Sequence, residues 1–340
     1  MSSQVAADRT ITDASYGRTS ADRIPLTHLL SSHNRLLVIG EPGGGKTTFL
    51  PFIASVLAKD ILGQGEPGLK SHLGLSVERP PLIPIFIRLS AVAGALKKGR
   101  ADIGGTCVWR VLSETMVELF GRAKAALLQK LLDDGRCALL LDGLDEEPNL
   151  NVRKQMVAVT DAVLHHWGKN LIVLSSRPFG YQVVSALENM ATAHIDAFGE
   201  EEILEFLNRW ATALFPDEEE RSRKAYLPEL KSAVMNIPRI RRMAKNPVML
   251  TCLCVVHWNE KKLPEGKANL LEAVLRWLLN AKEEKREARG YYNTFAEECF
   301  KSLALAMTKH PNGKQSHADL AWAAELLKNP FLDEMAIKLF

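Results

Sequence analysis

Short apolar runs alternate with longer stretches of mixed character along the N-terminal part of the chain. The runs are Leu36–Ile39, Ile83–Leu89, Ala138–Leu141 and Leu171–Leu174. Unbroken apolar runs of this length are typical of strands that are buried on both faces. Each run is separated from the next by enough residues for a helix, and a helical pattern from Thr47 to Lys59 follows the first. Strands that alternate with helices predict an α/β domain of three layers around a mainly parallel sheet.

After Ile195 the pattern becomes helical. Amphipathic segments occupy Glu200–Leu214, Tyr226–Ala244, Pro247–Trp258, Leu270–Glu287, Phe295–Met307 and His317–Leu327, and no β-rich run separates them. We therefore expect a helical C-terminal half. The mixed-charge run Lys282–Arg289 is typical of a solvated helix face or a domain joint, and we place a joint there. Residues 1–22 are polar and show no sustained periodicity, which indicates a flexible lead-in.

Composition and charge narrow the class of protein. Hydrophobic residues make up 46% and charged residues 24% of the chain, as in folded soluble proteins. The net charge of +3 creates no strong field, so we expect neither nucleic acid nor a membrane as a partner. The longest apolar stretch, Val248–Trp258, is too short to cross a bilayer. The basic segment Pro238–Lys245 has no interleaved aromatic residues, and we expect a solvated or nucleotide-facing helix there.

Several side chains with reactive or polar groups are expected to be structural. The five cysteines lie in largely apolar stretches and predict buried, reduced thiols in a cytoplasmic protein. Cys252 and Cys254 would point about 200° apart on a helix, which disfavours a shared metal ion. Trp210, Trp258 and Trp277 fall on apolar helix faces and are expected in the core. His257 is expected at the surface or near a helix end.

A phosphate-binding motif follows the first apolar run. Its residues are Gly40, Glu41, Pro42, Gly43, Gly44, Gly45, Lys46 and Thr47, which fit the pattern G-x-x-x-x-G-K-[ST]. The motif stands after a predicted buried strand and opens a predicted helix, which is the context in which it binds nucleotides. Glycines let backbone N–H groups surround a β-phosphate, Lys46 adds a cation for the β- and γ-phosphates, and the Thr47 hydroxyl can bind Mg²⁺. We assign nucleotide contacts to this loop and to Thr48.

Polar side chains follow two further predicted strands. Asp142, Asp145 and Glu146 come after one strand, and Arg177 comes shortly after another. Ligands bind at the carboxyl edge of an open parallel sheet, so these groups are expected to lie near the phosphate loop. Asp142 is assigned to Mg²⁺, Glu146 is the favoured general base, and Asp145 is the alternative base. Arg177 is expected to sense or neutralise the γ-phosphate; the alternatives are helix capping or a pair with a surface carboxylate.

These motifs together resemble one family. The segments GEPGGGKTT, ALLLDGLDEEP, LIVLSSRP and NPVMLTCLCVVHW are similar to those of NACHT proteins, which are signal-transducing NTPases of the AAA+-related STAND class. The resemblance covers residues 33–280 and is closest in character to bacterial antiviral members. It implies a P-loop NTPase core at 23–196, a helical lid at 197–285 and the start of a winged-helix domain at 286–340. It also implies that Pro247 packs on the base of the bound nucleotide.

The resemblance implies a regulatory function. ATP, or with less support GTP, would bind with Mg²⁺, and slow hydrolysis would switch the protein between a resting and an assembling form. The activated protein would form homo-oligomers in innate-immune or antiphage signalling. We expect the effector and sensor regions of the family to lie outside this chain, which would be a fragment or a truncated member. A module locked by ADP without significant turnover is the alternative, and a P-loop kinase or a nucleic-acid motor is less favoured.

Overall fold

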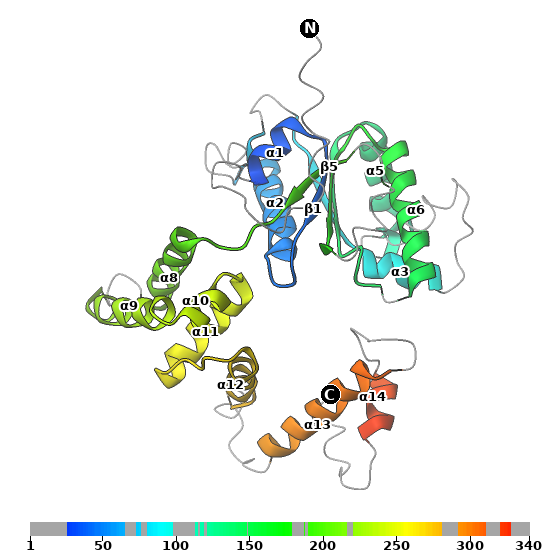
Figure 1. Ribbon diagram of the computed structural model, residues 1–340. Coiled ribbons are helices and arrows are strands. Elements are labelled where there is room, and N and C mark those ends of the chain that lie inside the picture. Colours follow the sequence, from blue (N-terminus) through cyan, green and yellow to red (C-terminus); the bar gives the residue numbers. More distant parts are fainter. Residues whose placement is uncertain are drawn as a thin grey trace.

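The computed structural model combines an α/β unit with a helical half (Figure 1). It describes residues 26–64, 73–75, 80–97, 113–114, 116–118, 121–147, 149–178, 187, 190–215, 220–280, 292–310 and 320–327. The lead-in at 1–22 and the charged run Lys282–Arg289 lie outside the described residues. In the described part of the chain, no helix is long and apolar enough to cross a membrane.

Five parallel strands form a single sheet in the order β2-β3-β4-β1-β5. Their bounds are Arg35–Ile39 (β1), Ile83–Arg88 (β2), Cys137–Asp142 (β3), Leu171–Ser176 (β4) and Ala191–His194 (β5). The central strands β3 and β4 are buried at every position, which explains their unbroken apolar sequence. All four predicted strands are present. The fifth, β5, has no apolar run because it is an edge strand with one fully buried residue, Ala193.

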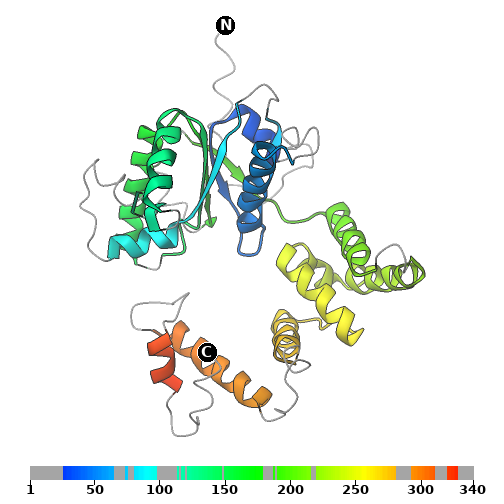
Figure 2. The same cartoon turned by 180° about the vertical axis from the view of Figure 1, so that it is seen from behind.

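Helices cover both faces of the sheet (Figures 1 and 2). On one face lie α1 (Leu26–Ser32) and α2 (Lys46–Ile61), and on the other lie α3 (Leu89–Lys97), α5 (Arg122–Asp133) and α6 (Leu150–His166). Side chains of β1 alternate between two apolar clusters, with Leu36 and Val38 against α2 and Leu37 and Ile39 in the opposite cluster. The arrangement agrees with the predicted α/β layers around a parallel sheet.

The helical half has a third apolar core of its own. Its elements are α8 (Glu200–Leu214), α9 (Glu220–Met235), α10 (Pro238–Ala244), α11 (Pro247–Glu260) and α12 (Lys267–Asn280), followed by α13 (Tyr292–Thr308) and α14 (Leu320–Leu327). The single helix predicted over Tyr226–Ala244 is wrong, because Pro238 begins a new helix at its first position. In α10 the side chains of Arg239, Arg241 and Arg242 are exposed, as expected for a solvated helix.

No disulfide joins the described cysteines. Cys137, Cys254 and Cys299 are buried, and Cys252 is half-buried. Burial raises the pKa of both Cys137 and Cys254 to about 12, so these thiols stay protonated and behave as small apolar side chains. This agrees with the structural role predicted for them, whereas Cys107 lies outside the described residues.

Two predictions about α11 need correction: Trp258 is not in the core, and His257 lies near the helix end, as expected, but is not at the surface. His257 is only 2% exposed and packs against the ring of Tyr226, with 5.4 Å between ring centroids. Its Nδ1 has no hydrogen-bond partner among the described residues. Trp258 is 40% exposed and makes an edge contact with Phe215. The ammonium of Lys261, at the C-cap of α11, lies over the Tyr226 and Trp258 rings and covers this end of the core.

The buried imidazole of His257 predicts an acid-sensitive helical half. Burial and the nearby Lys261 hold the pKa of His257 below its ordinary value of 6.5, against an opposing effect of Glu229. Below the ordinary pKa of about 6.5, the unfolded chain therefore binds a proton at His257 more readily than the folded protein does. The free energy of unfolding falls as pH decreases through this range. We expect His257→Phe to reduce the fall in unfolding free energy between pH about 7.5 and about 5.5, measured by urea denaturation.

The exposed His165 provides the control, because His165→Phe removes an imidazole without changing a buried site. An undiminished pH dependence in His257→Phe, equal to that of His165→Phe, would contradict this account.

Candidate functional site

A glycine loop, Gly40–Gly45, connects β1 to α2 at the carboxyl edge of the sheet. Gly43 has a φ of 76° and Gly45 a φ of 100°, values that other residues rarely adopt. A Cβ at Gly43 would also lie 2.8 Å from the side-chain oxygen of Asn246. The loop therefore depends on glycine both for its backbone conformation and for its close approach to the helical half.

The start of α2 suits an anion. Its N-cap residue, Gly45, has no side chain that could accept a hydrogen bond from the first amides of the helix. A Cβ at Gly45 would meet no atom within 4 Å, so the space beside this residue is open. Unpaired amides at a helix start, together with the positive end of the helix dipole, are the groups that bind phosphate. The residues present therefore fit the phosphate groups of a nucleotide.

Lys46 is a buried cation inside the loop. Its side chain is 9% exposed, and Nζ donates to the carbonyl oxygens of Gly40 and Glu41. Burial lowers the pKa of Lys46, and Asp145, Asp142 and Glu41 oppose this effect, whereas Arg177 adds to it. The charged groups of the loop, of the end of β3 and of the residue after β4 therefore lie near one another at this edge of the sheet.

The end of β3 holds Asp142 in a fixed position. Asp142 is 6% exposed, and its Oδ1 accepts a hydrogen bond from the hydroxyl of Ser175 on β4. The same hydroxyl accepts from the backbone N–H of Gly143 at 3.0 Å. The sequence predicts a hydroxyl group of Ser175 at this edge of the sheet, but not its contact with Asp142. Arg88, the last residue of β2, lies opposite Asp142 in the register of the two strands. The sequence did not assign Arg88 to the site.

Asp145 and Arg177 form a two-point contact. The backbone N–H of Arg177 donates to Asp145 Oδ1 at 2.9 Å, and its side-chain Nε lies 3.0 Å from Oδ2. The Asp145 side chain is 8% exposed and that of Arg177 is 46% exposed. A pair with a surface carboxylate was one alternative to a γ-phosphate role for Arg177. Arg177 does pair with a carboxylate, but this carboxylate is the buried Asp145 of the predicted site. Both Asp145 oxygens are engaged, which disfavours this residue as a base.

Glu146 is half-buried and folds back over Gly143. A Cβ at Gly143, whose φ is 84°, would lie 2.8 Å from the Glu146 carboxyl carbon, so glycine is needed there. Among the described residues, no hydrogen bond or ion pair engages the Glu146 carboxylate. The adjacent Glu147 is different, because it is 6% exposed and its carboxylate lies 2.9 Å from Lys97 Nζ on α3. Glu147 anchors the acidic loop, and the sequence gave no sign of that contact.

The helical half touches the glycine loop through Asn246, the N-cap of α11. Its Nδ2 donates to the carbonyl of Pro42 at 2.9 Å. Its Oδ1 accepts from the backbone N–H groups of Val248 at 3.1 Å and Met249 at 3.2 Å. One amide side chain therefore caps the helix and tethers it to the loop. Pro247 occupies the first helical position, where its missing N–H leaves no bond unmade.

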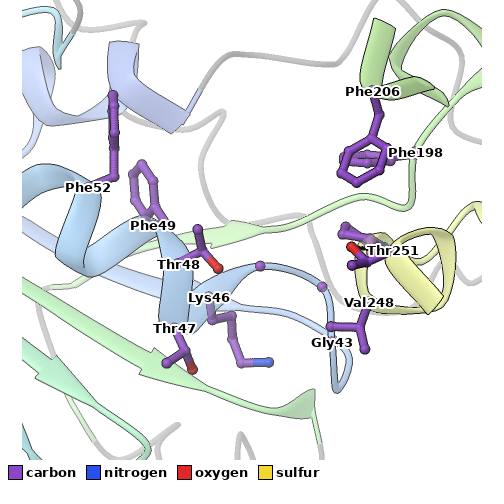
Figure 3. A pocket seen from close by; sticks show the side chains of 13 residues that line it. Gly43, Lys46, Thr47, Thr48, Phe49, Phe52, Phe198, Phe206, Val248 and Thr251 are labelled. Carbon is purple, nitrogen blue, oxygen red and sulfur yellow. Dashed lines mark hydrogen bonds between the residues drawn. The ribbon is translucent and has the colours of Figure 1, made fainter. Parts of the chain in front are cut away.

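A cavity of about 830 Å³ lies between the loop, α2 and the helical half (Figure 3). Its lining residues are Gly43, Gly44, Gly45, Lys46, Thr47, Thr48, Phe49, Phe52, Phe198, Phe206, Pro247, Val248 and Thr251. The volume is in the range of sites that bind small ligands. Thr48 and Pro247, which the sequence assigns to the nucleotide site, line this cavity together with the glycine loop. The four aromatic residues of the lining were not predicted, because Phe49 and Phe52 on α2 meet Phe198 and Phe206 of the helical half only in the folded protein.

Comparison with known proteins adds no relative. A scan against protein-family models and a search of curated proteins both give no match for this sequence.

The two roles of Asn246 can be separated by substitution. Asn246→Ala removes the helix cap, which costs about 1 kcal/mol, and also removes the tether. Asn246→Asp keeps a capping oxygen but loses the donor to Pro42, because a carboxylate cannot donate. We expect amide exchange of residues 40–45 to accelerate in both variants, and that of the first turn of α11 to accelerate only in Asn246→Ala. Hydrogen exchange followed by mass spectrometry gives both readings.

Asn149 provides the matched control, since it caps α6 through the N–H groups of Asn151 and Val152. Asn149→Asp should leave exchange in the glycine loop unchanged. Wild-type exchange of residues 40–45 in Asn246→Asp would refute the tether.

Proposed function

We propose that this chain is an ATP-binding, slowly hydrolysing switch module of the NACHT type. The observation that carries the proposal is the position of Lys46, which begins α2 directly after the glycine loop and lies near the charges of Asp142, Asp145 and Arg177. These are the groups that P-loop NTPases use on the phosphates, the metal ion and the transferred phosphoryl group. In such a module the nucleotide would control homo-oligomeric assembly in innate-immune or antiphage signalling.

The phosphates would bind on the glycine loop and the start of α2. The backbone amides there would hold the β-phosphate, and Lys46 would exchange its contacts with Gly40 and Glu41 for the β- and γ-oxygens. Thr47 and Asp142 would hold Mg²⁺, which neutralises charge on the β- and γ-phosphates when bound. Asp142 suits this role because Ser175 fixes its carboxylate at the edge of the sheet.

Glu146 is our choice of base for hydrolysis. A water would attack the γ-phosphorus and pass a proton to the Glu146 carboxylate, while the bond from the γ-phosphorus to the bridging oxygen breaks to give ADP and phosphate. Asp145 is less suited, because Arg177 engages both of its oxygens. Arg177 would turn from Asp145 to the γ-phosphate, where a planar guanidinium can bind two oxygens.

The runner-up function is a module that is locked by ADP and turns over little. The contact between Asp145 and Arg177 favours it, since this contact must open before Arg177 can reach a γ-phosphate. Mass spectrometry of the nucleotide that co-purifies with the protein tests the class of ligand and distinguishes adenine from guanine nucleotides. Recovery of no nucleotide, with no binding of added ATP, ADP or GTP, would refute both functions.

Lys46→Ala tests the phosphate site. Loss of the buried cation removes charge-assisted bonds worth about 1.5–3 kcal/mol, so affinity for ATP should fall by about 10- to 150-fold in titration calorimetry. Lys59→Ala, at the exposed end of the same helix, is the control and should bind as the wild type does. Equal affinity for ATP in Lys46→Ala and the wild type would refute the role of Lys46 in phosphate binding.

Glu146→Gln tests the base. The amide keeps the size of the side chain but cannot take up the proton, so turnover should fall by about 10²- to 10⁴-fold while ATP affinity stays the same. Phosphate release measures turnover, and the exposed Glu201→Gln is the control. Unchanged turnover in Glu146→Gln would transfer the role of base to another group. Negligible turnover in the wild type, with tight ADP binding, would instead support the ADP-locked module.

A further inference from the structure

Phe52 is a large apolar side chain of α2 that does not pack in the core beneath this helix. The buried residues of α2 include Leu50, Ile53 and Leu57, which face the sheet. Phe49 is half-buried and packs against that same core. Phe52 is 45% exposed, although it lines the cavity beside the glycine loop. A phenylalanine held open to solvent in a cavity is suited to bind an apolar or aromatic group.

The opposite wall of the cavity is apolar as well. It consists of Phe198, Phe206, Pro247 and Val248, together with the hydroxyl-bearing Thr251. The rings of Phe198 and Phe206 lie 6.4 Å apart at 49°, and Val248 is 48% exposed. Figure 3 shows Phe49 and Phe52 on one side, Phe198, Phe206, Val248 and Thr251 on the other, and the glycine loop between them.

The two walls and the loop together indicate which kind of ligand would fit the cavity. The loop offers backbone amides and Lys46 to an anionic end. The walls offer apolar and aromatic surface to a flat, uncharged end. A nucleotide has both ends, and its base exposes two aromatic faces.

We propose that Phe52 stacks on the base of the bound nucleotide and makes the site selective for purine over pyrimidine nucleotides. The inference rests on the proposed nucleotide site and names a residue that determines its specificity. Stacking on an aromatic side chain is worth about 1–3 kcal/mol per base, and a two-ring purine covers more of the Phe52 ring than a one-ring pyrimidine does. Pro247 and Val248 line the same cavity from the helical half.

The test compares Phe52→Ala with Phe300→Ala. Phe300 on α13 is 42% exposed and does not line the cavity, so it matches Phe52 in size and exposure. Calorimetry with ADP, CDP and inorganic diphosphate, each with Mg²⁺, separates the base from the phosphates. We expect Phe52→Ala to lose about 5- to 150-fold in ADP affinity, less in CDP affinity, and none for diphosphate. Phe52→Trp should retain ADP affinity, and Phe300→Ala should match the wild type with all three ligands.

The outcomes distinguish this inference from the function on which it rests. Unchanged ADP affinity in Phe52→Ala, with a loss in Lys46→Ala, would place the base elsewhere and leave the nucleotide site intact. An equal loss of ADP and diphosphate in Phe52→Ala would make Phe52 a support of the loop and overturn the stacking role. Equal binding of ADP and CDP by the wild type would overturn the purine selectivity. If the wild type bound neither ADP nor diphosphate, the proposed function would fail, and the inference would fail with it.

Discussion

The buried ammonium of Lys46 sets the main constraint on the α/β unit. A cation removed from water is costly unless nearby groups compensate for its charge. Two loop carbonyls accept hydrogen bonds from Lys46, and the carboxylates of Asp142 and Asp145 add favourable charge. These groups can converge only where a parallel sheet ends several strands at one edge and a glycine loop bends back over that edge. One requirement, compensation of the buried Lys46 charge, therefore depends on the loop sequence, the strand order and the acidic residues together.

The acidic edge is itself a network of fixed contacts. Ser175 holds Asp142 and also accepts from the Gly143 amide, so β3 and β4 are joined beyond their last ladder bonds. Glu147 is held by Lys97 on α3 and also accepts from the Asn149 amide before α6. Glu146 lies between these anchored residues, and its backbone position is thereby restricted from both sides. The Glu146 carboxylate itself has no hydrogen bond or ion pair among the described residues, so its side chain is the part of this edge that can still turn.

Among the described residues, Asn246 and Val248 connect the helical half to the glycine loop. Asn246 bonds the Pro42 carbonyl, and Val248 lies beside Gly43, where any side chain on the glycine would collide. Beyond these contacts the two parts face each other across a cavity with aromatic walls. Under the proposed function, a nucleotide would add contacts to both walls and so favour one angle between the two parts. Differential contact of this kind is what allows a ligand to shift a conformational equilibrium.

The sequence by itself determined the α/β class, four of the five strands, the glycine loop and the identity of the charged groups at the sheet edge. Those features depend on local signals, namely unbroken apolar runs, a motif of fixed spacing and polar residues after strands. Only the tertiary structure decided that Arg177 pairs with Asp145, that Lys97 holds Glu147 and that His257 is buried. It also brought Phe52, Phe198 and Phe206 around one cavity. Each of these contacts joins elements far apart in the chain, and the geometry that selects such partners exists only once the sheet and helices have packed.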